Sequence, residues 1–232
     1  STTQGGCRAV QFYSTGGSDQ FDLHVFGNLI HDAICDGINF STVNPNNGTV
    51  EDYNNIVYHV GTGPDPANSS SNYSCIVTGG SSGGSTPAQL YNNTLYDCGA
   101  RKTSDSGAID PTIPTRIYNN IVYQLSGEYY VNPNAGTSDL SGSNNLWYGV
   151  SGAPTATTSN RTRIPLLVSP TIDFHLQSTS PAINAGTTIS GLTWDFEGNV
   201  RPQGTAFDIG AYEYASGVTR PAPPTNLTGT VQ

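Results

Sequence analysis

Few side chains in the sequence could carry out acid–base chemistry. The only lysine, Lys102, stands in a loop three residues before Asp105, and Asp110 ends the next strand-like segment. A lysine with a lowered pKa beside such carboxylates could act as a proton-abstracting base. Glycoside hydrolysis instead needs two carboxyl groups on facing positions. Asp110 has no evident partner of that kind unless folding brings Asp19 or Asp139 close to it.

The other titratable residues are interpreted as structural or solvated. His24, His31, His59 and His175 do not converge by spacing, and none is expected to be catalytic. An acid-rich set near the C-terminus is interpreted as a structural network around an arginine–carboxylate pair. The sequence requires no cofactor, although calcium is the cation that this set could hold. The set comprises Asp195, Glu197, Arg201, Asp208 and Glu213.

The composition predicts a β-rich protein. Charged residues make up 11% of the 232 residues and the formal net charge is −9, which disfavours nucleic acid because that partner needs a basic surface. Helix formers are few, whereas strand and turn residues are plentiful. No apolar run has the length of a membrane-spanning helix.

A short motif recurs along the chain, as in RIYNNIVYQ (116–124) and LYNNTLYD (90–97). The second asparagines of the pairs are separated by 27, 38, 27 and 25 residues, and strand-like segments stand before and after each pair. A third segment follows after a variable loop: INFS (38–41), CIVTG (75–79), AID (108–110) and YYVN (129–132), with AVQFY (9–13) as an earlier copy. Three strands per repeat predict a right-handed single-stranded parallel β-helix. The aligned asparagines are Asn28, Asn55, Asn93, Asn120 and Asn145.

The asparagines are expected to stack at one corner of the coil. Asparagine tolerates the left-handed conformation of a sharp turn, and stacked amides can bond to one another. Three residues later an aromatic column is expected to stack in parallel and to face inward, with His31 at its start. Trp147 then faces outward as a platform for a ligand, or lies beneath the loop 150–163. The column comprises Tyr58, Tyr96, Tyr123 and Tyr148.

Strand alternation sorts the third segment of each repeat into two faces. Val10, Phe12, Ile38, Phe40, Ile109 and Val131 are expected to point inward. Amides, hydroxyls and aromatic rings on the opposite face could contact the hydroxyls and the apolar faces of sugar rings. This candidate carbohydrate-binding face comprises Gln11, Tyr13, Asn39, Ser41, Asp110, Tyr130 and Asn132, together with Trp147.

Four cysteines without a CxxC spacing favour disulfides over zinc, and hence an extracellular protein. Cys35 and Cys98 end the strand after the asparagine turn, whereas Cys7 and Cys75 open the third strand. Four cysteines allow three pairings, and the places of these residues in the repeat favour Cys7–Cys35 and Cys75–Cys98.

Residues 164–214 resemble the C-terminal end of many bacterial β-helix proteins of the pectin-lyase-like superfamily. The resemblance lies in SPAINAG (180–186), DFEGNVRP (195–202) and DIGAYEY (208–214). It implies an all-β solenoid with an irregular C-terminal cap, and it leaves the function open because this fold hosts lyases, hydrolases, epimerases and binding modules. Lyases of the superfamily use a lysine or arginine base near acidic calcium ligands. The paired aspartates and Gly-His-Gly of its polygalacturonases are absent here.

Three hypotheses about function remain. The first is a non-catalytic carbohydrate-binding module, similar to those linked to xylanases, which targets a secreted enzyme to plant cell-wall polysaccharide, with xylan as the first candidate. The second is a β-helix polysaccharide lyase or glycoside hydrolase that uses Lys102, Asp105 and Asp110. The third is a structural stalk or adhesin. Residues 1–218 are expected to form one monomeric β-helix domain, with coils to about 163, and 219–232 a proline-rich linker toward a further, catalytic domain.

Overall fold

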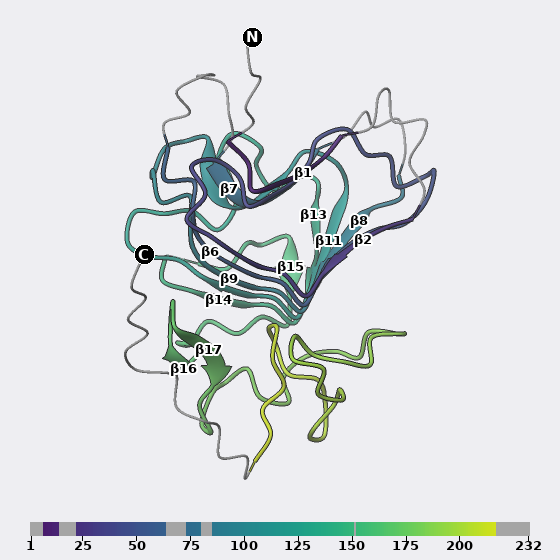
Figure 1. Ribbon diagram of the computed structural model, residues 1–232, viewed down its shortest axis with the longest axis vertical. Coiled ribbons are helices and arrows are strands. Elements are labelled where there is room, and N and C mark those ends of the chain that lie inside the picture. The colour runs from purple at the N-terminus through teal and green to yellow at the C-terminus, as the bar shows by residue number, and fades with distance from the viewer. Residues whose placement is uncertain (1–6, 14–21, 64–72, 80–84, 151, 217–232) are drawn as a thin grey trace, which may run out of the picture.

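The computed structural model describes residues 7–13, 22–63, 73–79, 85–150 and 152–216. These residues form an all-β solenoid in which the chain winds repeatedly past three parallel sheets (Figure 1). Sheet A contains β1 (Val10–Phe12), β4 (Ile38–Phe40), β7 (Tyr73–Thr78) and β10 (Ser106–Pro111). Sheet B contains β2 (Leu23–Phe26), β5 (Val50–Tyr53), β8 (Ala88–Tyr91), β11 (Thr115–Tyr118), β13 (Leu140–Ser143) and β15 (Thr157–Thr158). Sheet C contains β3 (Leu29–His31), β6 (Ile56–Val60), β9 (Thr94–Cys98), β12 (Ile121–Tyr123) and β14 (Leu146–Tyr148).

The predicted parallel β-helix is therefore confirmed, with one strand fewer than expected. The segment 129–132 does not form a strand, and only an isolated bridge pairs Ile109 with Val131. No helix that could span a membrane occurs among the described residues. Asp19 and the proposed linker 219–232 lie outside those residues, and the expected domain boundary at residue 218 stays a prediction.

Sheets B and C meet at the asparagine corner, and the predicted ladder is present. Asn93 donates from both its backbone N and its Nδ2 to Asn120 Oδ1, over 3.0 and 3.1 Å. Asn120 makes the same pair of bonds to Asn145 Oδ1. Asn55 and Asn93 also donate to carbonyls of the preceding sheet B strands. Each buried amide is thus satisfied by the coils beside it, so these bonds fix the register of the coils.

The two asparagines of each pair have different tasks. The first takes the left-handed conformation, with φ of 50° at Asn54, 53° at Asn92, 54° at Asn119 and 57° at Asn144. Glycine at position 27 does the same with φ of 66°. The second asparagine forms the ladder. The corner therefore needs a residue that tolerates positive φ, followed directly by an amide.

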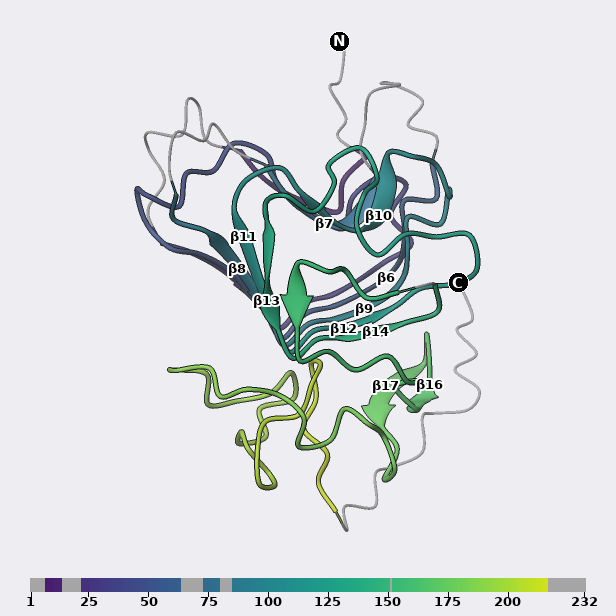
Figure 2. The ribbon, with the colours of Figure 1, turned by 180° about the vertical axis from the view of Figure 1, so that it is seen from behind.

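The C-terminal segment is irregular, as expected, apart from a hairpin of β16 (Leu167–Ser169) and β17 (Asp173–Leu176). It runs beside the coil, at the corner and over the outer face of sheet C (Figures 1 and 2). The first asparagines hold it there. Asn144 donates to Ala185 O, Asn119 to Thr187 O, and Asn92 to Asp208 O.

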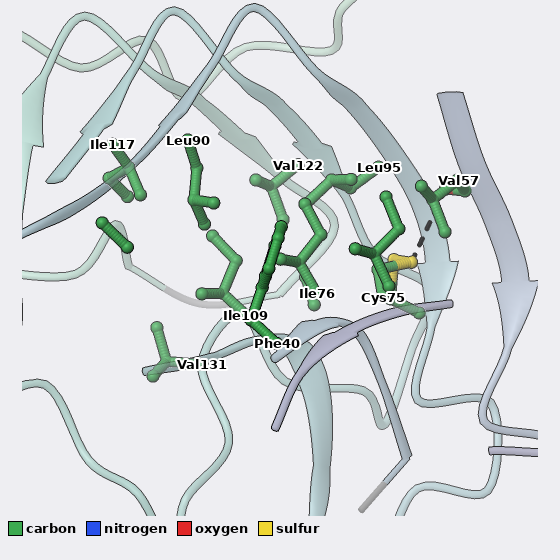
Figure 3. Close-up of a cluster of buried hydrophobic side chains, with 14 of the residues drawn as sticks. Phe40, Val57, Cys75, Ile76, Leu90, Leu95, Ile109, Ile117, Val122 and Val131 are labelled. Carbon is green, nitrogen blue, oxygen red and sulfur yellow. Dashed lines mark hydrogen bonds between the residues drawn. A yellow bond between two sulfur atoms is a disulfide. The ribbon is translucent and has the colours of Figure 1, made fainter. Parts of the chain in front are cut away.

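The interior of the coil is a column of apolar side chains from all three sheets (Figure 3). Ile38, Phe40, Ile109 and Val131 point into it as predicted. Trp147 is 1% exposed and also belongs to this core, so the first alternative, an outward-facing platform, is wrong. The second alternative is confirmed: the indole lies beneath the loop 150–163 and donates to Asn160 Oδ1 over 3.2 Å.

The tyrosine column faces outward, not inward as predicted. Tyr58, Tyr96, Tyr123 and Tyr148 pack against the C-terminal segment, whereas Val57, Leu95 and Val122 fill the interior. Side chains of a strand alternate between its two faces, so placing the tyrosines inside assigned every side chain of these strands to the wrong face. The stack is also not uniformly parallel: His31 and Tyr58 lie parallel at 4.9 Å, but Tyr96 and Tyr123 meet edge to face.

Both predicted disulfides are confirmed. Cys7 is bonded to Cys35 and Cys75 to Cys98. Cys7 precedes β1 and Cys35 follows β3, whereas Cys75 lies in β7 and Cys98 ends β9. Each bond therefore joins the sheet A side of a coil to the end of the sheet C strand that follows it in the chain.

Asn120→Ala is expected to lower the free energy of unfolding by about 3–5 kcal/mol, because it leaves the Asn93 amide and the Leu90 carbonyl without their partners in a buried site. Denaturant unfolding with the disulfides intact measures the change. The exposed loop variant Asn46→Ala serves as the control and should change the value by less than about 0.5 kcal/mol. Equal effects of the two variants would contradict the ladder.

Asp52 places a carboxyl group inside this core. Burial raises its pKa to about 7, although Asn55 and Asn93 favour the charged form. Between the ordinary pKa of 3.8 and about 7, the unfolded chain loses this proton while the folded chain keeps it. Stability is therefore lost as the pH rises through this window, by at most on the order of 4 kcal/mol.

Asp52→Asn should remove that loss. We expect the melting temperatures of variant and parent to differ least near pH 3.5. The melting temperature of the variant should then rise steadily relative to that of the parent up to about pH 8. Thermal unfolding followed by circular dichroism at a series of pH values tests this. A difference that does not vary with pH would contradict the protonated carboxyl.

Candidate functional site

The outer side of sheet A carries a connected row of neutral polar groups near its N-terminal edge. Gln11 Nε2 donates to Ser41 Oγ over 2.6 Å, and Ser41 Oγ donates to Asn39 Oδ1 over 2.5 Å. Asn39 Nδ2 then donates to Asp36 Oδ2 over 2.6 Å. Gln11 and Tyr13 are exposed, Tyr13 by 69%. Gln11 is held by Ser41 of the next coil, whereas Ser41 and Asn39 are held by residues of their own segment. The row is therefore ordered, and its accessible end lies at β1.

Asp36 anchors this row to the coil. Its carboxylate accepts from Arg8 Nε over 3.1 Å and from the backbone N of Ser74 over 3.0 Å. Burial nevertheless raises the pKa of Asp36 to about 6, against the opposing effect of these donors and of Asn39. The anchor therefore carries its full charge only above that pH.

The remaining predicted face residues are less accessible. Asn132 Nδ2 donates to Asp110 Oδ2 over 2.9 Å, and both residues are buried. Val77 separates this pair from Asn39 in the register of sheet A. Tyr130 does not point outward as predicted but packs on Trp147 in the core, and its hydroxyl donates to Val150 O. Asn39 is also buried, with 4% exposure, and it supports Ser41 from beneath. The accessible part of the candidate face is therefore reduced to Gln11, Tyr13 and Ser41.

The three residues of the acid–base hypothesis point to different partners. Lys102 Nζ donates to Ser126 O over 2.7 Å, Asp105 accepts from Thr103 Oγ1, and Asp110 accepts from Asn132. No contact joins these three side chains among the described residues. Burial raises the pKa of Asp110, which the hydrogen bond from Asn132 partly offsets.

A second cluster, which the histidine spacing did not predict, lies where the sheet C strands end. His59 Nδ1 lies 2.5 Å from Asp97 Oδ2, and its Nε2 lies 4.0 Å from Asp32 Oδ1. His31 Nδ1 lies 2.7 Å from the other oxygen of Asp32. Glu128 is close enough to Asp97 for the two carboxyl groups to interact. Its Oε2 accepts from the Leu125 amide, whereas its Oε1 is buried without a hydrogen-bond partner among the described residues.

The repeat explains how these residues meet. Asp32, His59 and Asp97 each follow a ladder asparagine by four residues, and all three have positive φ. Stacked coils place them one above another, although 27 and 38 residues separate them in the sequence. Alignment on the asparagines could therefore have found the cluster, whereas inspection of the histidines alone could not.

The cluster has the electrostatics of an acid–base pair. Burial raises the pKa of Glu128 to about 8, and the carboxylate of Asp97 raises it further while Lys102 opposes the shift. At neutral pH Glu128 is then largely protonated beside the carboxyl group of Asp97. Both carboxyl groups are buried, so a proton could reach or leave a ligand here only through the exposed imidazole of His59.

The C-terminal acidic residues form the expected structural network. Arg201 NH1 lies 2.6 Å from Glu213 Oε1, and both side chains are fully buried. Asp195 accepts from the backbone N atoms of Glu197, Asn199 and Glu213. Within the described ranges no group of three or more His, Cys, Asp or Glu residues has an arrangement that could hold a metal ion.

Comparison with known proteins identifies a shared fold. The solved structure of pectate lyase Pel9A is similar to this chain with a TM-score of 0.51 and 16% sequence identity. The similarity covers 82% of this chain and 50% of that chain, so the present chain spans about half of the lyase. No family model and no curated protein sequence matches the chain. This similarity supports the parallel β-helix and does not by itself assign an activity.

The Glu128–Asp97 pair makes a spectroscopic prediction. In Asp97→Asn the pKa of Glu128 should fall below about 8 but stay above its ordinary value of 4.5, because the neighbouring carboxyl is lost whereas burial, the largest cause of the shift, remains. Titration of the Glu128 carboxyl ¹³C resonance measures this shift. Asp139→Asn, which changes a half-buried carboxyl group that makes no hydrogen bond to Glu128 among the described residues, is the control. An equal response in both variants would contradict the pair.

Proposed function

We propose that the outer side of sheet A binds a neutral polysaccharide, and that the chain serves as a carbohydrate-binding β-helix. The observation that carries the proposal is an ordered polar row on this face, in which buried Asn39 holds Ser41 and Ser41 holds the exposed Gln11, two residues before the exposed Tyr13. Amides pair with sugar hydroxyls, and an aromatic ring covers the apolar face of a pyranose. A row already ordered by its own hydrogen bonds loses little side-chain entropy on binding.

The charge of the protein favours a neutral ligand over an acidic one. With a formal net charge of −9, the protein repels a polyanion such as polygalacturonate at low ionic strength. Xylan is therefore our first candidate ligand, and polygalacturonate enters the test because the similar structure is a pectate lyase.

We further propose a secreted, monomeric module that raises the local concentration of a covalently linked enzyme on its substrate. The two disulfides are compatible with an extracellular location. This proposal requires no cofactor in the chain itself.

A second candidate function is cleavage of the polysaccharide. The observation that favours it is the cluster of His59, Asp97 and Glu128, with Lys102 close enough to influence Glu128. Acid–base cleavage of a glycan needs a proton donor and a proton acceptor, and this cluster offers both. It replaces Lys102, Asp105 and Asp110 as the set to be tested for catalysis.

Affinity electrophoresis tests the binding proposal. Soluble xylan in the gel should retard the parent protein, and Gln11→Ala/Tyr13→Ala should lose at least about 1 kcal/mol of binding free energy, a change of roughly fivefold or more. Ile172→Ala, an exposed apolar residue in the C-terminal segment, should migrate like the parent. Polygalacturonate should retard the protein less than xylan does.

The same samples address cleavage. Reducing-sugar release or absorbance of unsaturated uronates would indicate an enzyme, and Glu128→Gln should then abolish the signal.

Two electrophoresis results would contradict the binding proposal. Equal retardation of the parent and of Gln11→Ala/Tyr13→Ala would contradict the sheet A site. Equal migration with and without every polysaccharide would contradict the proposed function altogether.

A further inference from the structure

A pocket lies away from sheet A, between the asparagine corner and the C-terminal segment. Its volume is about 450 Å³, and Phe26, Tyr53 and Asn54 from the coil line it together with Trp194 and Glu197 from the C-terminal segment. Sheet A and this corner lie on different sides of the coil in both views (Figures 1 and 2). The pocket is therefore separate from the proposed sheet A site.

The wall contributed by the coil is an aromatic ladder. Phe26, Tyr53 and Tyr91 stack at centroid distances of 4.9 Å, with planes 5° and 4° apart. Leu192 and Phe207 of the C-terminal segment cover the Tyr91 end of the ladder, but Phe26 remains 56% exposed. The open end of an otherwise covered stack thus faces the pocket.

The opposite wall presents the indole of Trp194, which is 55% exposed. Its backbone is fixed: Asn54 Nδ2 donates to Trp194 O over 2.7 Å, and Trp194 pairs with Val200 in an antiparallel bridge. The adjacent Asp195 binds the backbone N atoms of Glu197 and Asn199 through one carboxylate oxygen. The exposed ring is therefore presented from an ordered turn.

Polar groups accompany these rings. Glu197 lines the pocket, and its Oε1 lies 3.1 Å from Nε2 of His175. Thr193 adds an exposed residue to the same wall. Two open aromatic rings with carboxylate and hydroxyl groups beside them suit a ligand that has apolar faces and hydroxyl edges. A sugar ring has both, whereas the acidic wall disfavours an anion.

We propose that this pocket binds a pyranose unit of a neutral glycan, with Trp194 and Phe26 as its platforms. The inference does not rest on the sheet A proposal, because the two sites share no residue. If both sites are occupied by one glycan or by neighbouring chains, the protein holds its ligand at two points and gains avidity.

Tryptophan fluorescence tests the site directly. The sequence contains two tryptophans, and Trp147 is only 1% exposed, so acrylamide reaches Trp194 almost exclusively. We expect saturating xylohexaose or cellohexaose to lower the quenching constant at least about twofold and to shift the emission to shorter wavelength.

Calorimetry with the same oligosaccharides separates the two sites. Trp194→Ala should weaken one of the binding events about tenfold, and Ile172→Ala should leave it unchanged. Gln11→Ala/Tyr13→Ala should leave the quenching protection intact. Unchanged quenching with xylohexaose, cellohexaose, mannohexaose and galactohexaose would overturn the pocket proposal. Protection that disappears in Gln11→Ala/Tyr13→Ala would overturn it too, because the fluorescence change would then report binding at sheet A.

Discussion

The amide ladder at the corner between sheets B and C is the interaction on which the rest of the structure depends. A short coil of three strands buries little apolar surface alone, so each coil must be held in register with its neighbours. Asn55, Asn93, Asn120 and Asn145 do this from the inside of the corner. The asparagine before each of them sets the turn and binds the C-terminal segment, so one dipeptide closes the coil and attaches its outer cover.

This arrangement also determines where chemistry can occur. Register brings residues from successive coils to within a few ångströms, whatever the lengths of the intervening loops. The row from Gln11 to Asn39 arises in this way on sheet A, as does the column of Asp32, His59 and Asp97 beyond sheet C. The attached segment adds the third feature, the aromatic pocket between Phe26 and Trp194. The proposed binding sites and the carboxylate–histidine cluster thus occupy separate parts of one scaffold.

The sequence predicted the repeat, the strands, the asparagine corner and both disulfides, because these follow from residue types at fixed positions in the repeat. It did not predict the direction in which sheet C side chains point. Tyrosine fits either face of a strand, and Tyr58 and Tyr96 were assigned to the interior. Trp147 stands one position before the aligned tyrosine of its own strand, so the same assignment turned it outward. The pocket could not be predicted at all, because Trp194 reaches Phe26 only through the docking of an irregular segment that has no periodicity.

Hydrogen exchange of the asparagine side-chain amides, followed by NMR, tests the central claim most directly. The Nδ2 groups of Asn55, Asn93, Asn120 and Asn145 are expected to exchange at least about a hundredfold more slowly than that of the exposed Asn46, because exchange requires the coils to separate. Exchange of the four amides at the rate of Asn46 would contradict the ladder as the interaction that holds the coils together.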